Sequence, residues 1–323
     1  MNDKAWLLKE RQALPLDIKV RMSLDRITEW YNYWKGKAYV SFSGGKDSTV
    51  LLYLVRSIFP DIEAVFVDTG LEFPEIWGFV KSIDNVTWLR PKIKFPEVIE
   101  KYGYPAISKE VSQQIYEAKT TKSEKLLHKR LCGGDNKYKS GKIPEKWKYL
   151  IPCDIKIGHK CCDALKKRPI KKYEKQTGKA PIVGIMAIDS QARKQKYIRR
   201  GTCNSFSGKI ESNPLSFWTD SDVWEYIRKY DVPYSQIYDM GYDRTGCMFC
   251  MFGVHLEKGE NRFQRMRRTH PKQWDYCINK LGCGKVLDLI GVDYNSATPL
   301  FEKKQKEVKN EEANRAKLAT NGV

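Results

Sequence analysis

The feature that most constrains the fold is a glycine pair between two short apolar runs. Residues 41–49 read Ser-Phe-Ser-Gly-Gly-Lys-Asp-Ser-Thr and separate the apolar runs 38–40 and 50–52. This pattern predicts a strand that ends in a glycine turn and restarts as a helix. Free N–H groups at the start of such a helix form an anion site. The spacing is not that of the Walker loop, which needs four residues between its first glycine and Gly-Lys.

The side chains of this loop suit a bound phosphate. Gly44 and Gly45 allow the ligand to approach the backbone closely. Ser43 and Ser48 supply hydroxyl groups, and Lys46 supplies a positive charge. The loop is therefore our first candidate for a phosphate-binding site.

Strands and helices alternate along the chain. An apolar run at 64–67 ends in Asp68-Thr69-Gly70, a helix is expected from about Pro74, and strands are expected at 86–89 and 182–186. Helices are also expected at 17–34, 47–58 and 220–230. This order predicts an α/β fold with a doubly wound parallel sheet, whose ligands bind beyond the carboxyl ends of the strands. Asp68, Thr69 and Gly70 should therefore face the same crevice as the glycine loop.

The amino-acid composition limits the kinds of binding partner and the cellular compartment that can be expected. The chain carries 58 Lys and Arg against 39 Asp and Glu, a formal net charge of +19. Such an excess suits a nucleic acid partner, although a lysine-rich solvated surface would give the same count. We find no apolar stretch long enough to span a membrane and no signal-peptide pattern, so we expect a cytoplasmic enzyme without a membrane partner. In that reducing setting, cysteines are better read as metal ligands or reactive thiols than as disulfides.

The cysteines form a second pattern. Cys161-Cys162 and the Cys247-x-x-Cys250 turn lie far apart in the sequence and together offer four thiolates. Four thiolates suit either zinc or an iron–sulfur cluster. Adjacent cysteines fit a single tetrahedral zinc poorly, and buried unreactive thiols are the alternative to any metal. Among the remaining cysteines, Cys153 and Cys203 are rival ligands, Cys277 and Cys283 are expected to be structural, and Cys132 has no assigned role.

Taken together, these motifs resemble a known family. SGGKDS resembles the PP-loop of the ATP-pyrophosphatase superfamily. The order CC…CxxC is similar to the [4Fe–4S] motif of adenosine-phosphosulfate reductases. Residues 67–75 (VDTGLEFPE), the NPL of 213–215 and the DVW of 222–224 resemble segments of the wider phosphoadenosine-phosphosulfate reductase family. The resemblance covers about residues 36–253, with the motifs in family order.

The resemblance implies an adenine nucleotide α-hydrolase-like fold that splits ATP between its α- and β-phosphates, with Mg²⁺ as a cofactor. Lys46, Asp47 and Ser48 would act in catalysis, and Asp47 or Asp68 would recruit Mg²⁺. A [4Fe–4S] cluster, with zinc as the alternative, would be held by Cys161, Cys162, Cys247 and Cys250. The nucleotide would be bound by Ser41, Ser43, Gly44, Gly45, Lys46, Asp47, Ser48, Asp68, Thr69, Gly70, Gly184, Ser190 and Arg193.

Two departures from the reductases indicate a different reaction. Reductases of the family have an eroded loop without the lysine and use a cysteine near the C-terminus as nucleophile, whereas this chain keeps Lys46 and lacks that motif. A third change is Met186, where the reductases carry an arginine. The chain thus looks closest to ATP-cleaving iron–sulfur members, such as the ATP-pyrophosphatase component of DNA phosphorothioation systems.

Such members activate an acceptor by adenylylation so that sulfur can replace an oxygen. The expected partners are a nucleic acid acceptor and a sulfur donor such as a cysteine desulfurase. One alternative is a sulfonucleotide reductase that makes sulfite with a thioredoxin-like reductant. Another is a nucleotide-sensing module without turnover.

The sequence also predicts a division into domains. We expect a helical segment at 1–35, a PP-loop nucleotide-binding domain at 36–255 that carries the cysteines, and a helical C-terminal extension at 256–323. A lysine-rich stretch from 119 to 148 interrupts the second segment. The residues expected to contact a nucleic acid are Lys119, Lys122, Lys125, Lys137, Lys139, Arg199 and Arg200.

Overall fold

The computed structural model describes residues 3–134 and 140–295. The chain forms two compact units, each made of two separate segments. Unit 1 combines Met1–Phe95 with Cys162–Cys247, and unit 2 combines Pro96–Cys161 with Met248–Val323. This division differs from the consecutive segments 1–35, 36–255 and 256–323 expected from the sequence. The leading helices belong to unit 1, and residues 96–161 lie in unit 2 with the C-terminal helices.

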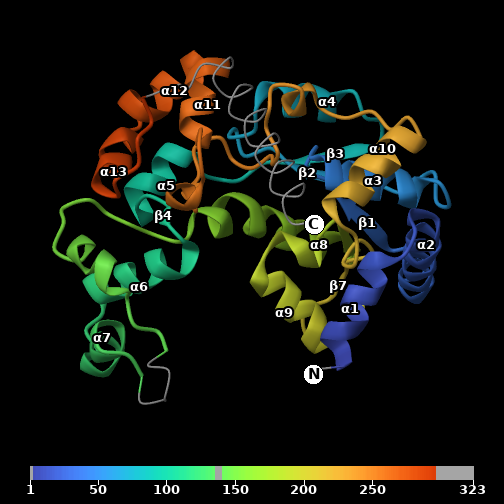
Figure 1. Ribbon diagram of the computed structural model, residues 1–323, viewed down its shortest axis with the longest axis horizontal. Helices are drawn as coiled ribbons and strands as arrows, with labels where there is room; N and C mark the ends of the chain where they lie inside the picture. Colours follow the sequence, from blue (N-terminus) through green and yellow to red (C-terminus); the bar gives the residue numbers. More distant parts are fainter. Residues whose placement is uncertain (1–2, 135–139, 296–323) are drawn as a thin grey trace, which may run out of the picture. The chain divides into compact units, whose positions relative to one another are not determined.

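Unit 1 is built on a twisted sheet with a central glycine loop. Within the described residues the sheet has six strands in the order β3-β2-β1-β5-β7-β6, all parallel except β6, which runs antiparallel to β7 (Figure 1). Their bounds are β1 Ala38–Ser41, β2 Ala64–Val67, β3 Val86–Leu89, β5 Ala180–Val183, β6 Asn204–Ser205 and β7 Glu211–Ser212. The chain runs from β1 outward to β3 and then crosses to β5 on the other side of β1. The fold is therefore α/β and doubly wound, as expected, and the switch point lies between β1 and β5.

The helices expected at 17–34, 47–58, from about Pro74 and at 220–230 are all present in unit 1. The helices of unit 1 are α1 Asp3–Ala13, α2 Leu16–Tyr33, α3 Lys46–Arg56, α4 Pro74–Lys81, α8 Arg168–Thr177, α9 Gln191–Arg200 and α10 Asp220–Lys229. α3 is almost wholly buried because it packs on β1 and between α2 and α10. Tyr173 of α8 packs against Tyr39 of β1 and Val65 of β2, so α8 covers the sheet face that carries those two side chains.

Unit 2 is mainly helical. Its helices are α5 Phe95–Tyr102, α6 Lys109–Thr120, α7 Glu124–Leu131, α11 Arg262–Thr269, α12 Pro271–Asp275 and α13 Cys283–Leu289. Its two short strands, β4 Ala106–Ile107 and β8 Met251–Phe252, pair in parallel. The expected helical character of the C-terminal region is confirmed up to residue 295, and the part beyond lies outside the described residues. In neither unit does a described helix have the length and apolarity to cross a membrane.

A buried carboxylate fixes the edge of the sheet to α9. Glu211 of β7 is only 2% exposed. It pairs with Lys196 and Arg200 of α9 and with Lys209, and it accepts a hydrogen bond of 3.1 Å from Asn213 Nδ2. Burial alone raises the pKa of Glu211, but the bonds from Lys196 and Lys209 outweigh it, and the pKa falls to about 2.

We expect Glu211→Gln to lower the free energy of unfolding by about 2 to 3 kcal/mol at neutral pH. The carboxylate is stabilising wherever it is ionised in both states, which is above its ordinary pKa of about 4.5. This contribution is lost as the pH falls toward the folded-state pKa of about 2. Chemical unfolding of both proteins should therefore give midpoints that differ most at neutral pH and converge in acid. A difference that stays constant down to about pH 3 would contradict this assignment.

Candidate active site

The glycine loop has the shape that a phosphate site requires. β1 ends at Ser41, and α3 begins at Lys46 with Gly45 as its N-cap. Gly44 has φ of +71°, and a Cβ there would lie 2.7 Å from Val80 Cγ2. The loop therefore turns where only glycine fits without strain, and it directs the first N–H groups of α3 outward from the carboxyl edge of the sheet.

Serine hydroxyls brace the loop from inside. Ser48 Oγ donates to Gly45 O at 2.9 Å and accepts from the backbone N–H of Ser43 at 3.1 Å. Ser43 Oγ lies 3.0 Å from Ser48 Oγ. Ser48 is buried, Ser43 is exposed, and Ser41 is half-buried at the end of β1. Ser48 thus holds the loop closed, whereas Ser43 is accessible to a ligand.

Lys46 is buried and held by two carboxylates. Its Nζ lies 2.7 Å from Asp47 Oδ1 and 2.5 Å from Asp220 Oδ1. Burial lowers the pKa of Lys46, but the two carboxylates outweigh burial and raise it. The pKa of Asp47 is raised by burial and by the charges of Asp189 and Asp220, against the opposing effect of Lys46. The loop therefore carries one fixed cation among three carboxylates.

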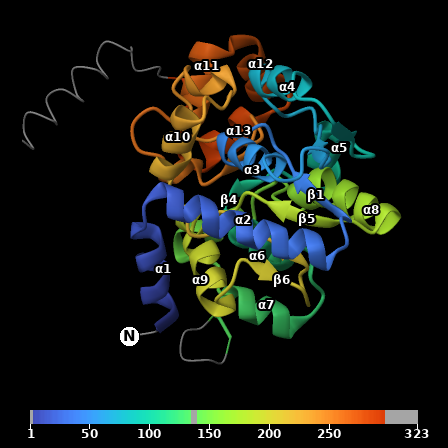
Figure 2. The ribbon, with the colours of Figure 1, turned by 90° about the vertical axis from the view of Figure 1, so that its right-hand side faces the viewer.

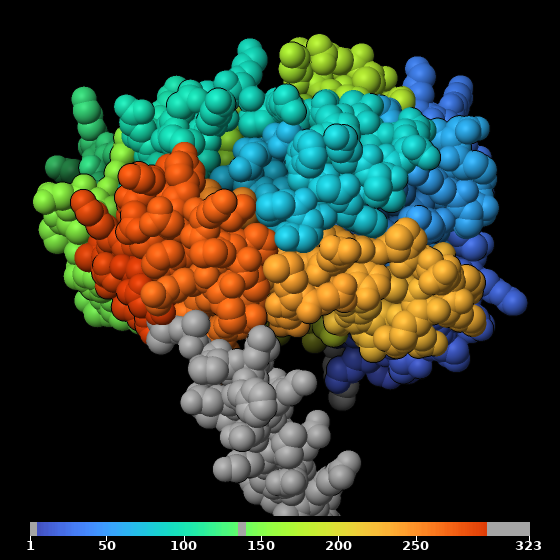
Figure 3. All heavy atoms as spheres, turned by 90° about the horizontal axis from the view of Figure 1, so that it is seen from above, coloured from blue at the N-terminus to red at the C-terminus, as the bar shows by residue number. Residues whose placement is uncertain are grey.

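A segment from the end of unit 1 lies on the loop. The backbone N–H of Lys46 donates to Tyr238 Oη at 2.7 Å, and Tyr238 Oη lies 3.3 Å from Thr245 Oγ1. A Cβ at Gly45 would lie 2.6 Å from Thr245 Oγ1. Figure 3 shows the segment that carries α10, in gold, beside the blue-to-cyan segment that carries α4, and the turn at 236–238 contacts α4. The Tyr238 hydroxyl thus accepts a hydrogen bond from a backbone N–H group that could otherwise donate to a phosphate oxygen.

Asp68, Thr69 and Gly70 follow β2, the neighbour of β1, at the same edge of the sheet. Asp68 pairs with Arg90 at 3.1 Å, and Thr69 Oγ1 donates to Glu72 at 2.8 Å. Within the described chain, no hydrogen bond or ion pair joins these three residues to the glycine loop. Their predicted roles in binding the nucleotide and Mg²⁺ stay predictions.

Gly184, Ser190 and Arg193 follow β5, the other neighbour of β1. A Cβ at Gly184 would lie 3.1 Å from Asp47 O, so Gly184 packs directly against the first turn of α3. Ser190 caps α9 by accepting from the backbone N–H of Arg193 at 3.2 Å, and Arg193 pairs with Asp189. The structure therefore places Gly184 against the loop. Arg193 pairs with Asp189, and the charge of Asp189 raises the pKa of Asp47 in the loop.

Unit 1 holds two of the four predicted metal ligands, Cys162 and Cys247. Both thiols act on the half-buried Lys166, which also pairs with Glu72 at 3.7 Å. Burial lowers the pKa of Lys166, and Cys247 and Glu72 outweigh it and raise the pKa. Burial raises the pKa of Cys247 despite the opposing charge of Lys166, so without a metal this cysteine favours the neutral thiol. A bound metal would take the thiolate form, and the Lys166 ammonium would offset its charge. Glu72 also connects this corner to Thr69.

Unit 2 holds the other two predicted ligands, Cys161, which is buried, and Cys250, which is half-buried. Across the residues that the structure describes, no group of three or more His, Cys, Asp or Glu side chains is placed to hold a metal ion. The assembly of Cys161, Cys162, Cys247 and Cys250 around one cluster therefore stays a prediction.

The other cysteines are mostly buried. Cys277 and Cys283 are fully buried and interact with each other, which raises the pKa of Cys277 beyond the effect of burial. Both observations agree with the structural role expected for them. Burial raises the pKa of Cys203 to about 11, which favours the neutral thiol at neutral pH. Cys132 is exposed, and Cys153 Sγ donates to Leu150 O at 3.0 Å.

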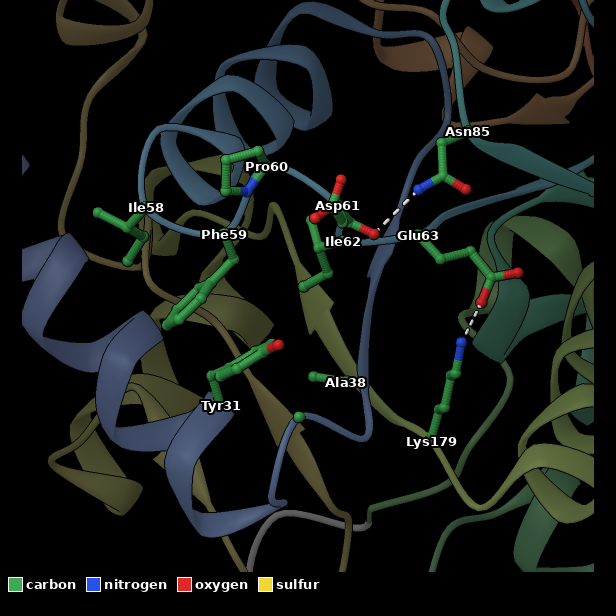
Figure 4. Close-up of a pocket in the computed structure, with 11 residues that line it drawn as sticks. Tyr31, Ala38, Ile58, Phe59, Pro60, Asp61, Ile62, Glu63, Asn85 and Lys179 are labelled. Atoms are coloured by element: carbon green, nitrogen blue, oxygen red, sulfur yellow. Dashed lines mark hydrogen bonds and ion pairs between the residues drawn. The ribbon is translucent and has the colours of Figure 1, made fainter.

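A separate cavity of about 460 Å³ opens at the amino edge of the same strands (Figure 4). Tyr31 and Phe59 stack on one side of it with ring centroids 3.7 Å apart. Glu63 and Lys179 pair at 2.6 Å on the other side. Ala38 and Lys179 stand at the starts of β1 and β5, so the cavity lies at the opposite edge from the glycine loop and is not part of the candidate active site.

Sequence reasoning missed the residues that reach the loop from a distance. Asp220 and Tyr238 contact Lys46 directly, and Lys166 contacts Cys247. Asp220 was visible only as the first residue of the helix expected at 220–230, and it follows Thr219, the N-cap of α10. Tyr238 lies in a stretch to which the sequence analysis assigned no element and no role.

The comparisons agree on one family. The family model described as phosphoadenosine phosphosulfate reductase domain matches residues 37–252. An adenosine 5′-phosphosulfate reductase of Geobacillus sp. (strain WCH70) is 30% identical over 250 residues, which cover 76% of this chain and 86% of that protein. An uncharacterised protein of Methanocaldococcus jannaschii is 28% identical over 274 residues, or 81% of this chain and 52% of that protein.

The chain spans about half the length of two such M. jannaschii relatives, 52% of one and 46% of the other. Among solved structures, the phosphoadenylyl-sulfate reductase of Candida auris in its phosphate complex matches 70% of this chain and 87% of that chain. Its sequence identity is 19% and its TM-score is 0.41.

Proposed function

The chain belongs to the phosphoadenosine phosphosulfate reductase domain family, and on that premise we propose that its glycine loop binds ATP and cleaves it between the α- and β-phosphates. The observation that carries this proposal is Lys46. Lys46 is buried at the N-terminus of α3, beside the N–H groups that would bind phosphate oxygens, and its ammonium could exchange Asp47 and Asp220 for a polyphosphate. The β- and γ-phosphates of ATP are such a polyphosphate.

The loop residues have distinct roles in this reaction. The first N–H groups of α3 bind the β- and γ-phosphate oxygens, and Lys46 neutralises the charge that grows on pyrophosphate as it leaves. Ser43 donates its hydroxyl to a phosphate oxygen, while Ser48 keeps the loop closed. When the nucleotide binds, a phosphate oxygen replaces the Tyr238 hydroxyl as the acceptor of the hydrogen bond from the Lys46 N–H group.

Carboxylates at the loop suit Mg²⁺. Asp47 and Asp220 both contact Lys46, and Asp189 lies near enough to raise the pKa of Asp47. Oxygen ligands of this kind are the ones that Mg²⁺ prefers, and a bound Mg²⁺ would relieve the mutual repulsion of the carboxylates. We therefore assign Asp47 and Asp220 as the residues that hold Mg²⁺ together with the phosphates.

We further propose that the acceptor is a nucleic acid and that the overall reaction is sulfur transfer. An acceptor oxygen forms a bond to the α-phosphorus, the bond from that phosphorus to the bridging oxygen breaks, and pyrophosphate leaves. A thiol reductant reduces the persulfide of a donor such as a cysteine desulfurase to hydrosulfide, which then bonds to the acceptor atom that carries the activated oxygen, while the bond from that atom to the oxygen breaks and AMP leaves. A [4Fe–4S] cluster on Cys161, Cys162, Cys247 and Cys250 would supply an iron that binds sulfide. Lys166 offsets the charge of the thiolates.

A second candidate function is the reduction of a sulfonucleotide to sulfite with a thioredoxin-like reductant. The relative from Geobacillus carries the name of an adenosine 5′-phosphosulfate reductase, and it covers most of this chain. Against it, a sulfonucleotide has no β- and γ-phosphates, so no pyrophosphate leaves whose growing charge Lys46 would neutralise.

The products of ATP distinguish these candidates. We expect the full chain, incubated anaerobically with ATP, Mg²⁺ and either DNA or tRNA, to release AMP and pyrophosphate, both measured by chromatography of labelled nucleotide. Release of ADP and phosphate would contradict cleavage at the α-phosphorus. Formation of sulfite from adenosine 5′-phosphosulfate and reduced thioredoxin, with no pyrophosphate from ATP, would favour the reductase.

A further inference from the structure

Helix α9 is strongly basic, and part of its charge is offset by Asp189 and Glu211. Its ten residues, Gln191–Arg200, contain no acidic side chain. Tyr197 and Ile198 are buried and hold the helix on unit 1, and Arg193 and Arg199 are exposed. Its basic residues are Arg193, Lys194, Lys196, Arg199 and Arg200.

Part of this charge is held in place by Glu211. One buried carboxylate pairs with Lys196, Arg200 and Lys209, which leaves the cluster with two positive charges in excess. Lys209 is 71% exposed although it is paired. Because these cations are already fixed, they lose little side-chain entropy when an anion binds to them.

The surface beside α9 is polar. A small cavity of about 20 Å³ is lined by Arg193, Lys196 and Arg200 together with Asn213 and Ser216. Asn213 Oδ1 is buried and has no hydrogen-bond partner among the described residues. The cavity has room for one water, which would satisfy Asn213 and bridge to a bound polar group.

α9 begins beside the candidate active site. It follows β5, so its first residue lies on the carboxyl side of the sheet, where the glycine loop lies. Asp189, two residues before α9, raises the pKa of Asp47 in the loop. α8 is also basic, but it precedes β5 and ends on the amino side, and Figure 2 shows it well away from α9.

We propose that α9 and Lys209 bind the phosphate backbone of the acceptor nucleic acid and lead its strand to the glycine loop. A ten-residue helix is about 15 Å long, which matches the axial rise of about four base steps. A row of phosphates can therefore run along the face of α9 that carries Arg193, Lys196 and Arg200, which are spaced i, i+3 and i+7. The inference rests on the proposed function only in taking the acceptor to be a nucleic acid.

This surface differs in part from the one expected from the sequence. Arg199 and Arg200 are in both. Lys119, in contrast, is engaged in unit 2, where it donates to the carbonyl oxygens of Cys153 and Ile155. Lys137 and Lys139 lie outside the described residues, and the roles of Lys122 and Lys125 stay predictions.

A charge-neutralised variant and a matched control test the surface. The test variant is Lys194→Gln, Arg199→Gln and Lys209→Gln together, which leaves Lys196 and Arg200 to pair with Glu211. The control is Lys171→Gln, Lys172→Gln and Lys175→Gln, three exposed positions on α8 with the same change in charge. Binding of a fluorescent DNA duplex and an RNA hairpin to the full chain is measured by anisotropy without ATP, at several salt concentrations.

We expect the α9 variant to bind at least about tenfold more weakly than the wild type, with a log–log salt slope shallower by about two to three. The α8 control should keep most of its affinity and its slope. The proposal is overturned if both variants lose affinity equally, or if the wild type binds neither DNA nor RNA at low salt. Because no ATP is present, failure of ATP cleavage would leave this result unchanged.

Discussion

Replacing Lys46 by alanine is expected to slow pyrophosphate release from ATP by about thirty- to a thousandfold. The side chain would contact the leaving phosphates in the transition state, where one fixed cation is worth about 2 to 4 kcal/mol. Rates at saturating ATP report this loss, because it belongs to the chemical step rather than to ground-state binding. The measurement is pyrophosphate released per chain under the conditions proposed above.

Two controls separate this effect from misfolding. Lys172→Ala on the exposed face of α8 removes a lysine from the same unit and should leave the rate unchanged. Lys46→Gln keeps a polar side chain between Asp47 and Asp220 and should fold as the wild type does, as judged by circular dichroism, while losing rate as alanine does. Wild-type rates in both Lys46 variants would refute the role of this lysine.

Removing either predicted metal ligand of unit 1 is expected to abolish the cluster. The anaerobically purified wild type should be brown and contain about four irons and four sulfides per chain. Cys162→Ser and Cys247→Ser should each be nearly colourless with little bound iron, because a cluster that loses a thiolate ligand is held far less tightly. Iron and acid-labile sulfide are measured against protein concentration.

The exposed Cys132 offers the matched control, and Cys132→Ser should keep full iron content. A wild type with one zinc per chain and no labile sulfide would replace the cluster by a structural zinc site. Full iron in both serine variants would instead exclude Cys162 and Cys247 as ligands.

The sheet and its loop could be predicted because their signals are local. The run at 64–67, the strand at 86–89 and the helix from Pro74 are where the sequence places them, since short apolar stretches between turn residues specify these elements. β5 was expected at 182–186 but spans Ala180–Val183. The chain leaves the sheet at Gly184, which packs on Asp47. The apolar run continues beyond the strand because Met186 is buried, although it pairs with no strand.

The contacts that complete the site could not be predicted because they join distant segments. Tyr238 reaches Lys46 across 192 positions, and Asp220 reaches it across 174. Neither residue stands in a pattern that differs from an ordinary turn or helix start. The division into units has the same origin, since residues 96–161 join the C-terminal helices through tertiary packing rather than through a sequence signal.

The residues that enclose the glycine loop affect how its chemistry could differ between related proteins. Gly44 is confined by Ile76 and Val80 of α4, Gly45 by Thr245, and Gly184 by the backbone of Asp47. None of these contacts involves the side chain of Lys46, which is held separately by Asp47 and Asp220. The glycine turn and the Lys46 ammonium group are thus held in place by separate contacts. Under the proposed function, a substitution at position 46 would change the charge that meets the phosphates while the glycine turn keeps its shape.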